Sequence, residues 1–136
     1  MRKRSVSREY ALQILYEIDI THDEHTQIFA TFWHLIEEDV SDEVKKFAAE
    51  LVELVVAHRE DIDKKIAQYA TNWELDRMAV VDRNVLRLGG CELLYRDDIP
   101  PKVSINEAVE LAKKFSGIQA GKFVNGILDK IKSERS

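Results

Sequence analysis

The sequence predicts an all-α protein of about seven helices, and three observations support this prediction. The chain of 136 residues has five glycines and two prolines, and the prolines, Pro100 and Pro101, are adjacent. Few such breakers, together with many Leu, Glu, Lys and Ala residues, favour helices over strands. Apolar residues recur at three- and four-residue steps along most of the chain, as in amphipathic helices. The length fits one domain over residues 1–136, whose core requires neither a disulfide nor a metal.

The first helix is predicted over residues 5–20, and a second follows it to about residue 38. The first segment has two apolar rows on nearly opposite faces, so it is expected to lie centrally or to have a second partner. Thr21 and Glu24 have the spacing of a capping box, which predicts the start of the second helix. The two rows of the first helix are Val6, Tyr10, Ile14 and Ile18, and Leu12, Tyr16 and Ile20.

A long helical stretch is predicted over residues 42–70, with Ser41 as its N-cap. No Gly or Pro interrupts this stretch, but a compact domain rarely holds a helix of that length. We therefore expect a bend near residues 58–61. A second capping-box pattern, Thr71 to Glu74, predicts a short turn that begins around Trp73.

A further helix is predicted over residues 80–96, and it contains the pair Gly89-Gly90. Each glycine costs a helix about 1 kcal/mol relative to alanine. The pair therefore indicates that the backbone of another helix crosses closely at this point. Residues 97–101 are predicted to form a loop, because adjacent prolines cannot continue a helix.

Two helices are predicted after this loop. Ser104 and Glu107 form another capping-box pattern, which predicts the start of the first one. Ser116-Gly117 is expected to end it. The last helix carries one apolar row of Phe123, Ile127 and Ile131 and a neighbouring row of Val124 and Leu128.

The sequence contains no pattern typical of an enzyme. It lacks a Gly-rich phosphate loop, a nucleophilic serine motif and a zinc-protease motif, so we predict no catalysis and no cofactor. Residues 22–25 (His-Asp-Glu-His) are the nearest approach to a metal site, although such a polar turn is usually just solvated. Asp97 and Asp98 are interpreted as turn-forming residues. The single cysteine, Cys91, is predicted to be a small core residue.

Composition also predicts the compartment of the protein. One cysteine excludes an internal disulfide and fits a reducing environment. No apolar run approaches the ~20 residues that a membrane span needs, and no signal-type apolar stretch follows the basic N-terminus. We therefore expect a cytoplasmic protein without a membrane partner.

The net charge of −5 is distributed unevenly along the chain. Residues 1–8 carry a charge of +4, residues 9–101 carry −12 and residues 102–136 carry +3. Attraction to phosphate depends on the local field, which salt screens beyond about 8–10 Å. If the two basic ends meet in the fold, they form a basic surface for nucleic acid. In the alternative interpretation, the charged ends are only solvated.

Five segments carry a resemblance to a known family. Residues 8–16 read Arg-Glu-Tyr-Ala-Leu-Gln-Ile-Leu-Tyr, and residues 81–88 read Val-Asp-Arg-Asn-Val-Leu-Arg-Leu. Residues 92–95 (Glu-Leu-Leu-Tyr), 98–108 (Asp-Ile-Pro-Pro-Lys-Val-Ser-Ile-Asn-Glu-Ala) and 122–129 (Lys-Phe-Val-Asn-Gly-Ile-Leu-Asp) follow in order. In these motifs the chain resembles the NusB family of bacterial transcription antitermination factors. Residues 22–70 match that family only in their helical pattern.

The resemblance implies a fold of two small helical bundles that pack across each other. It also implies a function without catalysis. Members of the family pair with NusE, a small-subunit ribosomal protein, and bind the boxA element of nascent RNA. Together with other Nus factors in the transcription elongation complex, the pair helps RNA polymerase to pass terminators in ribosomal RNA operons. A homodimer stays an open alternative.

The resemblance also implies which residues bind RNA. Residues 1–8 would be a mobile basic arm in which Arg2, Lys3, Arg4 and Arg8 contact phosphates. Tyr16 and Phe123 would offer flat faces on which single-stranded bases stack, although aromatic residues at helical spacing are equally often core residues. Lys122 would add a phosphate contact. Gln119 stands where the family usually has an acidic residue, and it could hydrogen-bond a base edge without repelling phosphate.

The partner-binding residues are predicted to be Asp82 and Arg83. NusE is expected to be basic, so an acidic contact would speed and orient its docking. The alternative role for Asp82 is that of a helix N-cap. Two other functions are alternatives for this chain. One is an RNA-modifying enzyme, because NusB-like domains occur fused to RNA methyltransferases, and the other is a module that binds only proteins.

Overall fold

The computed structural model describes residues 2–36, 39–70 and 74–134. Within these ranges the chain forms six α-helices and one 3-10 turn, with no strand, which confirms the all-α prediction. No helix among them is long and apolar enough to cross a membrane. The bounds are Lys3–Thr21 (α1), His25–Leu35 (α2), Asp42–Tyr69 (α3), Leu75–Arg77 (the 3-10 turn η1), Val80–Tyr95 (α4), Pro101–Ser116 (α5) and Ile118–Ser133 (α6).

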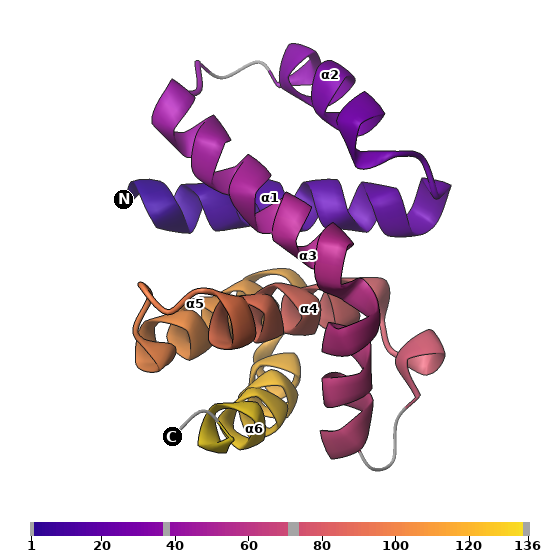
Figure 1. The fold of residues 1–136 in the computed structure, drawn as a ribbon, viewed down its shortest axis with the longest axis vertical. Coiled ribbons are helices and arrows are strands. Elements are labelled where there is room, and N and C mark those ends of the chain that lie inside the picture. Colours follow the sequence, from indigo (N-terminus) through magenta and orange to yellow (C-terminus); the bar gives the residue numbers. More distant parts are fainter. Residues whose placement is uncertain (1, 37–38, 71–73, 135–136) are drawn as a thin grey trace.

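The helices form two packed groups, as predicted. Figure 1 shows α1 lying across the molecule, with α2 and the first half of α3 on one side of it. The second half of α3, together with α4, α5 and α6, lies on the other side. Because α1 contacts α2, α3 and α4, it lies between the two groups. This central position buries Tyr10 and Ile14 of one apolar row, whereas Tyr16 and Ile20 of the other row stay exposed.

The long helix α3 begins and bends as predicted. The Ser41 side chain accepts a hydrogen bond from the backbone N–H of Val44 at 3.3 Å, which is an N-cap. The backbone leaves helical geometry at His58, where φ is −117° and ψ is 18°. At this bend the His58 ring stacks on the Tyr95 ring of α4, with centroids 4.0 Å apart. The bend lets one helix serve both groups.

Two of the predicted capping boxes are wrong. Thr21 is the last residue of α1, and its hydroxyl donates to the carbonyl oxygen of Glu17 at 2.9 Å, so it does not cap α2. Ser104 lies inside α5, which already begins at Pro101, and its buried hydroxyl donates to Glu92 at 2.8 Å. The third pattern lies outside the described residues at Thr71 and Trp73. Pro101 is the first residue of α5, and proline suits this position because the N–H that it lacks would have no partner there.

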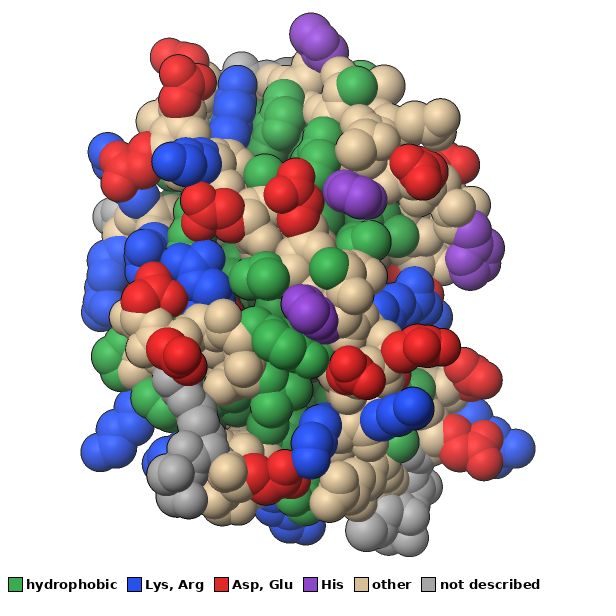
Figure 2. Space-filling model, viewed as in Figure 1, with side chains coloured by type: hydrophobic (Ala, Val, Ile, Leu, Met, Phe, Trp, Pro, Cys, Tyr) green, Lys and Arg blue, Asp and Glu red, His purple; other side chains and the backbone are tan. Residues whose placement is uncertain are grey.

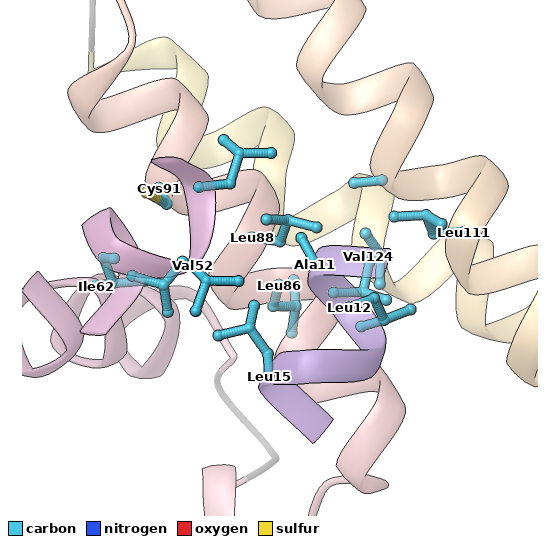
Figure 3. Close-up of a cluster of buried hydrophobic side chains, with 14 of the residues drawn as sticks. Ala11, Leu12, Leu15, Val52, Ile62, Leu86, Leu88, Cys91, Leu111 and Val124 are labelled. Carbon is cyan, nitrogen blue, oxygen red and sulfur yellow. The ribbon is translucent and has the colours of Figure 1, made fainter. Parts of the chain in front are cut away.

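One apolar core joins the two groups of helices. Figure 3 shows Leu12 and Leu15 of α1 in the same cluster as Leu86 of α4, Val52 of α3 and Val124 of α6. Cys91 is fully buried in this core, as predicted, and burial raises the pKa of its thiol to about 12. A thiol of that kind stays protonated at neutral pH, so Cys91 acts as a small apolar side chain.

A close approach occurs at Gly89 of the glycine pair, but it involves side chains and not the helix backbone that was predicted. A Cβ atom at this position would lie 2.7 Å from Leu128 Cδ1 of α6 and 3.2 Å from Ala108 Cβ of α5. A Cβ atom at Gly90 would instead meet Ile62 Cγ2 at 3.5 Å, an ordinary contact distance. Side chains of α5 and α6, rather than a helix backbone, therefore occupy the space that Gly89 leaves. Gly117, with φ of 107°, ends α5 as predicted.

Candidate nucleic-acid interface

A groove runs between α1 and α5 and continues to the start of α6; we call it the α1/α5 groove. Its first two hollows adjoin because they share Ser5, Glu107 and Glu110. Lys114 lines the second hollow, and the next residue, Phe115, lines the third. The groove therefore follows α1 from its N-terminus toward its C-terminal half, with α5 as the opposite wall.

The third hollow is mainly apolar and exposes aromatic surface. Tyr16 and Phe115 line it from opposite walls, and each is 43% exposed. Ile20, 53% exposed, extends the apolar lining along α1. Tyr16 is therefore not a core residue, and its ring is available to a flat ligand.

The fourth hollow brings together three of the predicted site residues. Asp82 from α4 lies beside Gln119 and Phe123 from α6 in a hollow of about 410 Å³, a size found in small-molecule sites. Gln119 is exposed, and Phe123 is half-buried. Val81 lines the third hollow, so consecutive residues of α4 connect the third hollow with the fourth.

Asp82 does not cap α4, so the alternative interpretation of this residue is wrong. The N-cap of α4 is Ala79, and Asp82 lies in the first turn of the helix. A carboxylate is favourable there because the helix dipole is positive at its N-terminus. Oδ1 of Asp82 is buried without a hydrogen-bond partner among the described residues. The Asp82 side chain is half-buried and lines the fourth hollow, so the exposed part of its carboxylate, rather than the buried Oδ1, can meet a ligand there.

The predicted basic residues at the N-terminus point in different directions. Arg2 lines the first hollow of the groove. Lys3 Nζ instead pairs with Glu43 of α3 at 2.9 Å, and the Arg4 guanidinium lies 4.4 Å from the centre of the Phe47 ring. All three residues are exposed. The basic surface therefore spans the end of α1, with Arg2 toward α5 and the other two toward α3.

Arg8 is an ion-pair partner inside the fold, and its prediction as an RNA contact on a mobile arm is wrong. α1 begins at Lys3, so Arg8 lies in the second turn of a helix and is 2% exposed. Its Nε and Nη2 donate to the two carboxylate oxygens of Glu92, each at 2.8 Å, and Nη1 donates to Glu107 at 3.2 Å. Two carboxylates occupy this guanidinium, so it is not free to bind phosphate.

Arg83, a predicted partner contact, lies in an internal network, and its side chain is 15% exposed. Its Nε and Nη2 donate to Asp19 of α1 at 2.7 and 3.0 Å, and Nη1 donates to the carbonyl oxygen of Leu75 at 3.2 Å. Burial raises the pKa of Asp19, but hydrogen bonds from Arg83 and Asn84 and the charge of Arg87 lower it to about 2. The network fixes the C-terminal half of α1 to α4.

The remaining predicted residues occupy simpler positions. Lys122 is exposed on α6 beside Phe123. The Asp98 carboxylate accepts hydrogen bonds from Nε and Nη2 of Arg96 within the turn that precedes α5. Across the described residues, no group of three or more His, Cys, Asp or Glu side chains could hold a metal ion.

Comparisons with known proteins identify the family of this chain. A model of the NusB family matches residues 5–133. The chain belongs to the NusB family. Its NusB relatives include the transcription antitermination proteins of Myxococcus xanthus (strain DK1622), 48% identical over 133 residues, and Bacillus subtilis (strain 168), 43% identical over 132 residues. These alignments cover 96% and 97% of this chain and 95% and 96% of the relatives.

Solved NusB structures share the fold. A NusB structure from T. maritima superposes with a TM-score of 0.86 at 35% identity, covering 98% of this chain and 92% of that one. A crystal structure of the antitermination factors NusB and NusE in complex with double-stranded RNA superposes with a TM-score of 0.84 at 32% identity, covering 98% of both chains. These likenesses confirm the NusB-like architecture that the sequence predicted.

Sequence reasoning missed the α5 wall of the groove in this NusB-family chain. No sequence pattern singled out Phe115 as a site residue, and Glu107 was expected to be part of a capping box. In the structure, Phe115 is exposed opposite Tyr16, and Glu107 faces α1 across the groove. The position of Phe115 two residues before Gly117, at the end of a helix, was the available signal of exposure.

Proposed function

We propose that this NusB-family protein is an RNA-binding transcription antitermination factor that pairs with NusE and catalyses no reaction. The observation that carries the proposal is the α1/α5 groove, which joins Arg2 at one end, Tyr16 in the middle and the Gln119–Phe123 hollow at the other end. The antitermination role of its relatives and the complex of a structural neighbour with NusE and RNA support it.

The aromatic lining favours single-stranded RNA as the ligand. Exposed rings such as Tyr16 stack on bases that are splayed out of a strand, whereas the bases of a duplex are already stacked on each other. We propose that the RNA is of the boxA type and comes from ribosomal RNA operons. Other Nus factors in the elongation complex would then be further partners.

The basic residues would contact the RNA backbone at the ends of the groove. Arg2, Lys3 and Arg4 are exposed around the N-terminus of α1, and Lys122 is exposed beside the fourth hollow. Each phosphate contact adds to affinity without reading sequence. Gln119 can both donate and accept hydrogen bonds, so its amide suits a base edge.

Asp82 is the proposed contact for NusE. Its half-buried carboxylate lines the fourth hollow, and a basic ribosomal protein would supply a cation or an N–H donor to it. Charge alone does not mark the docking face. Acidic and basic side chains are interspersed on the face that α3 crosses (Figure 2).

Co-purification with NusE followed by titration with single-stranded boxA-type RNA tests the proposal. We expect a NusE complex whose RNA affinity falls steeply with salt, and weaker binding of a duplex of the same sequence. Tyr16→Ala should weaken RNA binding about fivefold or more, because one base stack is lost. The control Leu35→Ala changes an exposed side chain on α2 and should have no effect. Absence of any RNA shift, with or without NusE, would favour a module that binds only proteins.

A further inference from the structure

The two walls of the α1/α5 groove are joined by side-chain hydrogen bonds. The backbone of α1 packs against α2, α3 and α4, and α5 packs against α4 and α6. Across the groove, Oε1 of Glu107 on α5 accepts a hydrogen bond from the hydroxyl of Ser5 on α1. The same oxygen accepts from Nη1 of Arg8 on α1 at 3.2 Å. One atom of α5 therefore holds two residues of α1.

This connection is anchored in the protein interior. Arg8 also pairs with Glu92 of α4, which is 1% exposed, and Glu92 accepts a further hydrogen bond from Ser104 of α5 at 2.8 Å. The network thus includes both walls of the groove and the helix beneath them. The Glu107 side chain itself is 19% exposed, and it lines the first two hollows. Glu107 belongs at once to the network and to the groove surface.

A carboxylate in this position repels the RNA phosphates that the groove is proposed to bind. The charge of Glu107 therefore opposes RNA binding, while its hydrogen bonds fix the spacing of α1 and α5. We infer that Glu107 is a positioning residue, which holds the two walls at the separation that a single strand of RNA requires. This inference rests on the function proposed above.

Glu110 provides the natural comparison. It lies one turn further along α5 and lines the same two hollows. Its carboxylate pairs with Lys113 of its own helix at 3.6 Å, so this ion pair does not bridge the walls. Both glutamates place a negative charge in the groove, but of the two only Glu107 bonds to α1. Lys114 of α5 forms a second bridge to α1 through its ion pair with Glu9, and none of the variants below changes this pair.

Two substitutions of Glu107 separate positioning from charge. Glu107→Gln removes the charge and keeps an Oε1 atom that can accept from both Ser5 and Arg8. Glu107→Ala removes the same charge together with both hydrogen bonds. We expect Glu107→Gln and the control Glu110→Ala to bind single-stranded RNA as tightly as the wild type or up to about threefold more tightly. Glu107→Ala should bind about three- to tenfold more weakly than Glu107→Gln.

Fluorescence anisotropy with labelled single-stranded RNA, at several salt concentrations, measures these affinities in the presence of NusE. The salt dependence should be the same for Glu107→Gln and Glu107→Ala, because both variants keep every phosphate contact. Equal affinities of these two variants would overturn the inference. If the wild type binds NusE but no RNA, the proposed function fails instead.

Ser5→Ala keeps the charge of Glu107 and provides a second test in case Glu107→Ala does not fold. Ser5→Ala deletes one of the two bonds to Glu107, and we expect it to weaken RNA binding about two- to threefold. Should Glu107→Ala fail to fold, an unchanged RNA affinity of Ser5→Ala would still contradict the positioning role.

Discussion

Replacing Arg8 with alanine is expected to destabilise the fold by about 3–5 kcal/mol, the usual cost of leaving one partner of a buried ion pair without the other. Arg8 is 2% exposed and Glu92 is 1% exposed, and two hydrogen bonds of 2.8 Å join them. After the substitution, Ser104 would be the remaining side-chain donor to Glu92 in this network. The loss of the guanidinium would also remove its contact with the Phe47 ring.

The size of the effect can be converted into a melting temperature. Unfolding entropy near 60 °C is about 2.1 cal/mol/K per residue, so a chain of 136 residues should melt about 10–17 °C lower. Differential scanning calorimetry and urea titration of the purified variant measure this change. Adding Glu92→Gln to Arg8→Ala removes the buried charge, and it should recover about 1–2 kcal/mol.

The control for this prediction is Lys3→Ala. Lys3 also forms an ion pair, with Glu43, but the side chains of this pair are 63% and 72% exposed. Its removal should change the melting temperature by no more than about 2 °C. If Arg8→Ala were as stable as Lys3→Ala, Arg8 would not be the buried partner described above, and the mobile basic arm would have to be reconsidered.

Three further predictions follow from the core and the site. Asp19 has a folded pKa of about 2 against an ordinary value of 3.8, so its contribution of about 2 kcal/mol is present above pH 4 and is lost as the pH falls toward 2. Arg96 also lowers the pKa of Asp98 to about 2, so urea titrations at each pH should show a loss that is about 2 kcal/mol larger in the wild type than in Asp19→Asn. Gly89→Ala should destabilise the fold by about 1–3 kcal/mol, because the new Cβ would clash with Leu128. Gly90→Ala meets only an ordinary contact, so it should be neutral or stabilise the fold by up to about 1 kcal/mol. Equal melting temperatures of the two variants would refute this difference. Asp82→Asn should weaken NusE binding with little change in stability, and an unchanged NusE affinity in calorimetry would place the partner surface elsewhere.

Local sequence patterns predicted the helices well and their caps poorly. Ser41 caps α3 as its spacing indicated, and the bend at His58 lies where a long uninterrupted helix had to fold back. Ser104 has the same spacing to a glutamate as a capping box, yet it donates to Glu92. A capping-box pattern records which groups are close along the chain, and it cannot show that a distant carboxylate competes for the same hydroxyl.

In the candidate site, local motifs predicted some residues correctly, whereas contacts between residues far apart in the chain could not be predicted. Tyr16, Gln119 and Phe123 were predicted from motifs, and the structure places all three in one groove. The sum of charges at the N-terminus counted Arg8 as available to RNA, although Glu92, 84 residues away in the chain, neutralises it. Phe115 was missed because its exposure depends on how α5 faces α1 across the groove.

The position of RNA on the folded protein tests the central claim most directly. Backbone amide shifts of isotope-labelled protein can be followed by NMR while single-stranded boxA-type RNA is added. We predict that the largest shifts follow the groove at Arg2, Tyr16, Gln119 and Phe123, and that Leu35 on α2 does not move. Shifts concentrated on the exposed surfaces of α2 and α3, with Tyr16 and Phe123 unchanged, would contradict the account.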